Sequence, residues 1–208
     1  MKGIRIYIEG GGEGKRQKGT LRTGFQVFLK PLRDAARAQR LNLDVVMCGG
    51  RQTAYRDYLI ALRHHTDSLN VLLVDAEGPV ADSPWRHLAA GDGWDDPGVG
   101  DDCCHLMVQM VEAWLIADPD ALEQYYGQGF RRSALPSQQD VEAISKQDLL
   151  RALEHASAHT SKQRYRKIQD CSALLARVSV AKVRHRAAHC ERLFDTLERM
   201  LRDSDDSR

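Results

Sequence analysis

Three short apolar runs, separated by stretches long enough for a helix, constrain the fold of this chain more than any other feature. They lie at residues 4–8, 43–47 and 70–74, and the third is mostly aliphatic and runs straight into Asp75. Near-continuous apolar strands that alternate with helices indicate βαβ units and a parallel sheet buried on both faces. The sequence therefore predicts an α/β fold with a mainly parallel sheet flanked by helices.

The segments between and after these runs have helical patterns. Helices are predicted at residues 21–39, 51–65, 146–156, 168–177 and 180–202. Pro31 is expected to kink the first helix, and residues 105–110 are predicted to form a fourth strand. The pair Asp118-Pro119 is typical of a helix start, and Gly127 of its end. A frayed polar tail is expected at residues 203–208.

Composition places the chain among ordinary globular proteins. Of its 208 residues, 42% are hydrophobic and 28% are charged, which is enough apolar material to bury a core. The five cysteines include no C-x-x-C pair, which argues against a disulfide framework and against a thiolate zinc site. No run approaches the roughly 18 apolar residues of a membrane helix, and no signal-peptide pattern precedes the first strand. We therefore expect a cytoplasmic protein without membrane association.

Charge is distributed unevenly along the chain, although the net charge is only +1. Residues 75–120 hold eleven acidic side chains and one basic, and they include an acidic loop at 91–102. Residues 160–192 hold nine basic side chains and two acidic. A cation site and a polyanion-binding surface in one molecule would give this pattern, and so would solvated loops and helix faces. The sequence leaves both interpretations open.

Acidic residues follow two of the predicted strands. Glu9 follows the first strand, and Asp75 and Glu77 follow the third. Ligands bind beyond the carboxyl ends of strands in open parallel sheets, and three carboxylates there would repel one another without a cation among them. Hard oxygen ligands suit Mg²⁺ or Mn²⁺, and such a site serves phosphodiester hydrolysis. Capping of a following helix is the alternative for each acid taken alone.

A glycine-rich segment at residues 10–14 links the first strand to a group of basic residues. It does not fit the Walker A motif, because Glu9 stands at the first glycine and Arg16 at the Ser or Thr. A phosphate backbone could be held by Gly11, Gly12, Lys15, Arg16, Lys18 and Arg22. Arg166 and Lys167 belong to a second predicted phosphate-binding cluster. A tight turn and solvated basic side chains are the alternative.

Three motifs in the sequence together resemble those of a known family. They are Ile-Tyr-Ile-Glu9-Gly-Gly-Gly, Leu-Leu-Val-Asp75-Ala-Glu77-Gly-Pro, and His105-Leu-Met-Val-Gln-Met-Val-Glu112-Ala-Trp-Leu-Ile-Ala-Asp118. Over nearly the whole chain they resemble an uncharacterised bacterial family, domain of unknown function 4276. That family is similar to the Toprim nucleases of the OLD and RloB type.

The resemblance implies a Toprim-like, Rossmann-like catalytic domain at residues 1–128, with residues 129–208 packed on it as a helical extension in one compact unit. In that superfamily a Glu after the first strand and two Asp after a later strand hold the metal, and the Glu often serves as general acid or base. Carried over, Glu9, Asp75 and Glu77 are metal ligands and catalytic residues, with Glu77 departing from the usual Asp. By analogy with the third motif, Glu112 is an additional catalytic residue.

The implied function is that of a Mg²⁺- or Mn²⁺-dependent nuclease acting on DNA or RNA. The resemblance also implies a role as effector in an anti-phage defence system, beside an ATPase of the ABC or OLD class. One alternative is a non-catalytic regulatory subunit of such an ATPase complex on a degenerate Toprim fold, suggested by Glu77 and the acidic loop. Another is an enzyme that processes free nucleotides. The sequence does not fix the oligomeric state, and a homo-oligomer is compatible with it.

Overall fold

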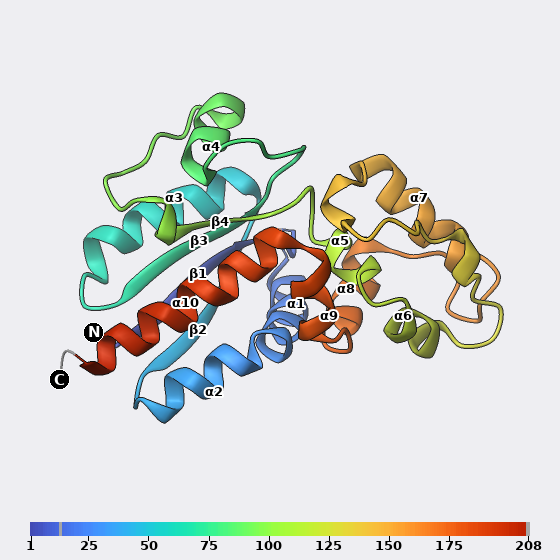
Figure 1. The fold of residues 1–208 in the computed structure, drawn as a ribbon, viewed down its shortest axis with the longest axis horizontal. Helices are drawn as coiled ribbons and strands as arrows, with labels where there is room; N and C mark the ends of the chain where they lie inside the picture. The colour runs from blue at the N-terminus through green and yellow to red at the C-terminus, as the bar shows by residue number, and fades with distance from the viewer. Residues whose placement is uncertain (13, 207–208) are drawn as a thin grey trace.

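The computed structural model describes residues 1–12 and 14–206, and its centre is a parallel sheet of four strands within that part of the chain (Figure 1). The strands are β1 (Gly3–Glu9), β2 (Asn42–Gly49), β3 (Leu69–Asp75) and β4 (Cys104–Met107). Their order across the sheet is β2-β1-β3-β4, and every neighbouring pair is parallel. The predicted α/β, Rossmann-like arrangement is thus confirmed.

Helices cover both faces of this sheet. The α-helices are α1 (Lys15–Phe28), α2 (Lys30–Ala38), α3 (Arg51–His64), α4 (Pro84–Asp92), α5 (Glu112–Ile116), α6 (Pro119–Tyr126), α7 (Lys146–Ser157), α8 (Lys167–Leu175), α9 (Val180–Arg186) and α10 (Ala188–Asp206). Three short 3₁₀ turns, η1 (Asp101–Cys103), η2 (Arg132–Ala134) and η3 (Val141–Ala143), lie between them.

The two faces of the sheet carry two separate hydrophobic cores, because successive side chains of a strand point to opposite faces. Ile4, Ile6 and Ile8 of β1 pack into the larger core, which also takes side chains from α1, α2 and α10. Tyr7 of β1 points the other way and packs with α3 and α4, where Tyr58 is fully buried. Burial on both faces explains why the strands are nearly continuous apolar runs.

The C-terminal helices share the larger core with the first half of the chain. Phe28 of α1 stacks on Trp114 of α5 at 5.0 Å and meets Phe194 of α10 edge to face at 5.9 Å. Helix α8 packs against α1 so closely that a Cβ on Gly24 would lie 2.7 Å from the carbonyl oxygen of Ser172. The division at residue 128 stays a prediction, but side chains from both sides of it form one core.

Several predicted boundaries are wrong. The helix predicted at 21–39 begins at Lys15 and is interrupted at Leu29, with Pro31 in the first turn of α2. The helix predicted at 180–202 is broken at Ala187 and continues as α10 to Asp206, so residues 203–206 are helical; residues 207–208 lie outside the described part. The predicted fourth strand ends at Met107 rather than at residue 110. Within the described part, no helix has the length and apolar character to cross a membrane.

Candidate metal centre

The carboxyl ends of β1 and β3 meet where the order of the strands reverses. The chain passes from β1 to β2 on one side and returns to β3 on the other side of β1, so the crossing connections diverge between β1 and β3. Such a switch point is the usual ligand crevice of an open parallel sheet. Glu9 is the last residue of β1 and Asp75 the last of β3. Topology therefore delivers both acids to the same crevice.

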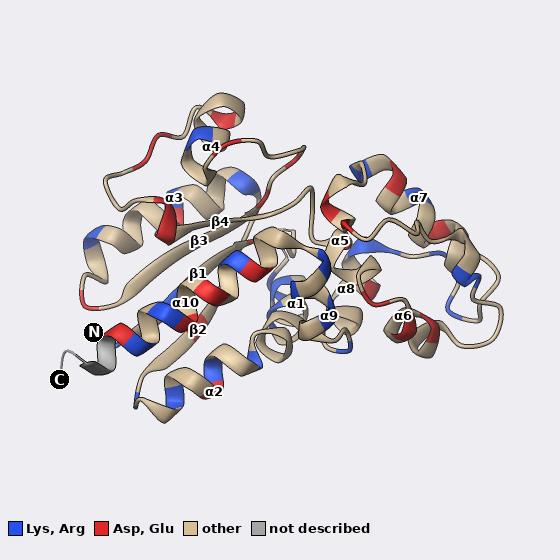
Figure 2. Cartoon of the chain, viewed as in Figure 1, with Lys and Arg blue, Asp and Glu red and all other residues tan. Residues whose placement is uncertain are grey.

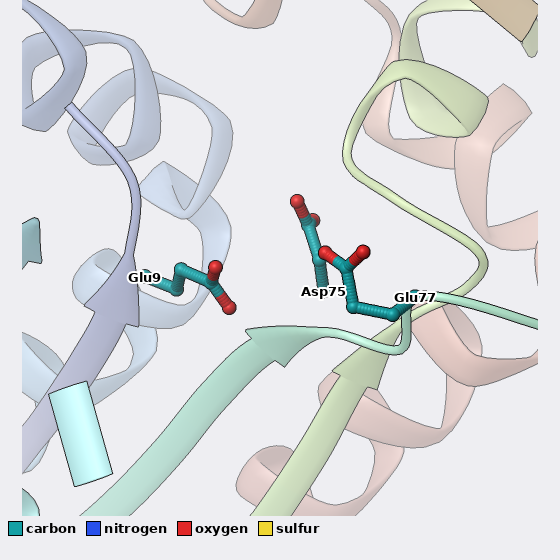
Figure 3. A group of neighbouring side chains, drawn as sticks. All are labelled: Glu9, Asp75 and Glu77. Carbon is teal, nitrogen blue, oxygen red and sulfur yellow. The ribbon is translucent and has the colours of Figure 1, made fainter. Parts of the chain in front are cut away.

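Glu77, two residues beyond β3, completes a cluster of three acids (Figure 3). One carboxylate oxygen from each of Glu9, Asp75 and Glu77 lies within 4.8 Å of the others. Two oxygens on opposite sides of Mg²⁺ are separated by about 4 Å, so small side-chain movements would fit this set to the ion. Among the described residues, no other group of three His, Cys, Asp or Glu side chains meets this test.

The backbone of Glu77 is strained. Its φ of 67° lies in the left-handed region, which costs a residue with a Cβ roughly 1–2 kcal/mol. The Glu77 N–H donates to the carbonyl of Gln109 at 2.9 Å, which holds the peptide in this conformation. Strained residues of this kind concentrate at functional sites. Here the conformation directs the Glu77 carboxylate toward Asp75 and Glu9.

Each acid of the cluster is paired with a cation of the chain. Arg51 lies 3.0 Å from Glu9, Lys167 lies 3.6 Å from Asp75, and Lys146 forms an ion pair with Glu77. Lys146 and Lys167 are the first residues of α7 and α8, so the C-terminal helices place two of the three cations. Each of the three carboxylates therefore has a cation partner, but Arg51 also pairs with Asp92 and Lys167 with Glu112, so two of the cations are shared with a second acid.

The contacts of Arg51 with the site were not predicted from the sequence. Arg51 begins α3, and its guanidinium donates to Glu9, to the carbonyl oxygen of Asp75 at 2.5 Å, and through two nitrogens to Asp92 at 2.6 Å each. The guanidinium also lies 5.1 Å from the centre of the Trp94 ring. Arg51 thus joins the ends of β1, β3 and α4. Asp92 lies 41 residues away in sequence, so no local motif could have signalled the pair.

Glu112 lies next to the cluster but outside it. Its side chain is fully buried, and its Oε1 accepts a hydrogen bond from the Tyr165 hydroxyl at 2.9 Å. Lys167 Nζ lies 3.6 Å from Glu112 Oε2 and also 3.6 Å from Asp75 Oδ2. Glu112 therefore contacts the site through Lys167, and its catalytic role stays a prediction.

Burial sets the proton affinities of the cluster. Burial raises the pKa of Asp75 to about 7, against the opposing charge of Lys167, although the backbone N–H of Val111 also donates to it at 2.9 Å. Burial likewise raises the pKa of Glu9, and Arg51 offsets part of that rise. Burial disfavours the Lys167 ammonium, but Asp75 and Glu112 outweigh this effect and raise its pKa. A cation bound among the acids would favour their ionised forms.

The predicted phosphate-binding glycines lie beside the acids. Gly11 and Gly12 have φ values of 84° and 59°, and a Cβ on Gly11 would lie 2.9 Å from the Cα of Lys18. Both glycines line a cavity of about 280 Å³ whose wall also includes Glu9 and Asp75. The loop therefore needs glycine for its conformation and for its close packing on α1.

The predicted basic residues divide into two groups. Lys15, Arg16 and Arg22 are exposed on α1, and Arg166 is exposed just before α8. Lys18 lies in α1 as well, and its ammonium donates to the Cys48 carbonyl at 2.9 Å, near the end of β2. Phosphate binding by these residues stays a prediction.

Comparison with known proteins identifies one family. The model of a family described as a domain of unknown function (DUF4276) matches residues 8–198, and the chain therefore belongs to this family. No curated protein and no solved structure matches the chain. The match spans the three acids, Arg51, and both lysines that pair with the cluster.

Proposed function

We propose that this family member is a nuclease that depends on Mg²⁺ or Mn²⁺ and hydrolyses phosphodiester bonds in DNA or RNA. The observation that carries the proposal is the convergence of Glu9, Asp75 and Glu77 at the switch point of the sheet. Carboxylate oxygens are the donors that these cations prefer, and a substrate phosphate commonly completes their coordination.

The proposed roles follow from the positions of the side chains. Glu9, Asp75 and Glu77 would hold the cation. When bound, such a cation lowers the pKa of a water ligand and neutralises charge on a phosphate. Lys167, which reaches the cavity beside the acids, would hold a phosphate oxygen, and Glu112 would keep its ammonium in place. Glu9 is the candidate proton acceptor, because the resemblance to the Toprim nucleases gives this role to the Glu after the first strand.

A basic surface beside the cavity suits a nucleic-acid substrate. Figure 2 shows Lys and Arg gathered on α1 and on the segment that leads into α8. Lys15, Arg16 and Arg22 are exposed on α1, which follows the glycine-rich loop, and Arg166 is exposed just before α8. Cations arranged in this way neutralise backbone phosphates without reading their sequence.

The wider role is proposed from the likeness of the three motifs to the Toprim nucleases. We propose that the chain is related to the Toprim nucleases and is located in the cytoplasm. There it would act as the effector of an anti-phage defence system, together with an ATPase partner of the ABC or OLD class. A requirement for such a partner would make cleavage by the isolated chain weak. The ATPase should therefore be included in assays wherever its gene accompanies this one.

The first experiment measures cleavage of labelled DNA and RNA with Mn²⁺, together with Mn²⁺ binding followed by electron paramagnetic resonance. Glu9→Gln and Asp75→Asn should abolish cleavage and weaken Mn²⁺ binding. Glu154→Gln, on the exposed side of α7, and Asp67→Asn, at the opposite end of β3, are matched controls that should change neither. Unchanged cleavage in the first two variants would refute the proposal.

A second candidate is a regulatory subunit that binds an ATPase without catalysis. The ion pairs of the cluster favour it, because each of the three acids has a cation of the chain as its partner, Arg51, Lys146 or Lys167. This candidate predicts that Mn²⁺ does not bind at the cluster and that Glu9→Gln leaves assembly with the ATPase unchanged. The Mn²⁺ titration therefore separates the two functions before any substrate is known.

A further inference from the structure

Two adjoining hollows run outward from the acids along the seam between α1 and α8. The inner one, about 280 Å³, has Glu9 and Asp75 at one end and the glycine-rich loop along one side. The outer one, about 440 Å³, is lined by Arg16, Gln17, Thr20, Ile168 and Gln169. Gln17 and Ile168 line both hollows, so the two adjoin each other at these side chains. Helices α1 and α8 pack against each other beneath them.

The inner hollow combines an apolar wall with a charged end. Leu21, Phe25, Val111 and Cys171 contribute the apolar wall, while Lys167 and the acids lie at the charged end. This volume is of the order of one base with its sugar. A paired base would have to leave its stack to enter the hollow. The charged end would receive the adjoining phosphate.

The outer hollow continues this path over a basic surface. Arg16 lines it directly, Lys15 is exposed beside Arg16 on α1, and Arg166 is exposed just before α8. Gln169 adds a side-chain amide that can donate to phosphate or base. A strand leaving the inner hollow would therefore meet cations and hydrogen-bond donors, as in proteins that bind single strands.

Ile168 stands at the junction of the two hollows. It is 57% exposed, which is the largest exposed fraction among the large hydrophobic side chains in the described residues. A branched aliphatic side chain held in water at this position contributes nothing to the core. Apolar side chains placed between neighbouring bases act as wedges that keep the bases unstacked. The location between a one-base hollow and its continuation fits that role.

We propose that these hollows bind single-stranded nucleic acid, with one base in the inner hollow, the next in the outer hollow, and Ile168 between them. This inference rests on the proposed function and specifies its substrate: an unpaired end or loop of DNA or RNA. A continuous duplex cannot place a base in the inner hollow without unpairing it.

The test is fluorescence anisotropy with labelled single-stranded DNA and RNA oligonucleotides and with the same sequences annealed into duplexes. Ca²⁺ replaces Mg²⁺ so that cleavage does not interfere. Ile168→Ala should weaken single-strand binding about tenfold, and Ile168→Phe should restore it through stacking. Ile60→Ala is the matched control, because Ile60 is 48% exposed on α3, and it should have no effect.

The outcomes separate this inference from the proposed function. Equal affinity for duplex and single strand, an unaffected Ile168→Ala variant, or a free nucleoside monophosphate that binds as tightly as the oligonucleotide would each overturn the inference. Duplex cleavage that depends on Mn²⁺ and Glu9 would leave the nuclease proposal standing without it. Single-strand binding that depends on Ile168, in a protein that never cleaves, would preserve the binding site and remove the catalysis.

Discussion

Acidification should destabilise this protein through one buried histidine. His105 lies in β4 and is fully buried. Its Nδ1 accepts a hydrogen bond from Arg192 at 3.0 Å, and its Nε2 lies 3.1 Å from the Asp102 carbonyl, which fixes the neutral tautomer with the proton on Nε2. Burial, assisted by the charge of Arg192, lowers the pKa of His105 from 6.5 to about 3. A proton added to Nδ1 would face the Arg192 guanidinium.

The magnitude follows from this pKa difference. Between the two pKa values the unfolded chain binds a proton at His105 and the folded chain does not, so stability falls as the pH falls below 6.5. A pH of about 5 lies roughly 1.5 units below the pKa of His105 in the unfolded chain. At about 1.36 kcal/mol per unit, the free energy of unfolding decreases by about 2 kcal/mol relative to about pH 7.5.

Urea denaturation at the two pH values measures this loss. With a denaturant slope of about 2 kcal/mol per molar, the His105 contribution moves the midpoint by about 1 M. His105→Asn retains an acceptor for Arg192 but cannot take up a proton, so its pH dependence should be smaller by the same amount. Other titrating groups cancel in the comparison of the two proteins. An identical pH dependence in both would refute the reasoning.

Two further predictions concern the acids of the site. Arg51→Met should lower the free energy of unfolding by about 3 kcal/mol, because it leaves Glu9 and Asp92, whose side chains are each only 16% exposed, without their cation. A urea titration that shows a loss below about 1 kcal/mol would contradict this. Glu77→Gly should raise stability by about 1 kcal/mol by relieving the positive φ, since the exposed pair with Lys146 contributes little, while Mn²⁺ binding weakens about tenfold. Calorimetry of unfolding and Mn²⁺ titration check the two parts, and a variant that loses stability would show that the backbone is unstrained.

The elements that the sequence predicts best are those governed by local pattern. The run at 70–74 forms β3, and the acids at the ends of β1 and β3 meet because parallel strands bring their carboxyl ends to one edge. Asp118 caps α6 by accepting from the Ala121 N–H at 3.4 Å, and Gly127 follows its last residue, as expected.

Other features escaped prediction. The helix α4 was not predicted, although Ser83-Pro84 is a local start signal, Gly93 a local end signal, and Trp85 and Leu88 have helical spacing. The remaining misses depend on distant contacts or on a local break. Arg51 looked like an ordinary helix start, because its partners Glu9 and Asp92 come from two other elements. The break at Ala187 separates two helices that each continue the same apolar periodicity, which a pattern alone reads as one helix.

If the cluster binds Mn²⁺ as proposed, the cations beside it would separate folding from the supply of metal. Arg51, Lys146 and Lys167 already lie against the three acids, so the chain would reach its native state without the ion and bind it later and reversibly. The ion would have to compete with these cations, which would lower its affinity. Each lysine that the ion displaced would then be free to bind a substrate phosphate, so ion uptake would prepare the same groups that receive the substrate.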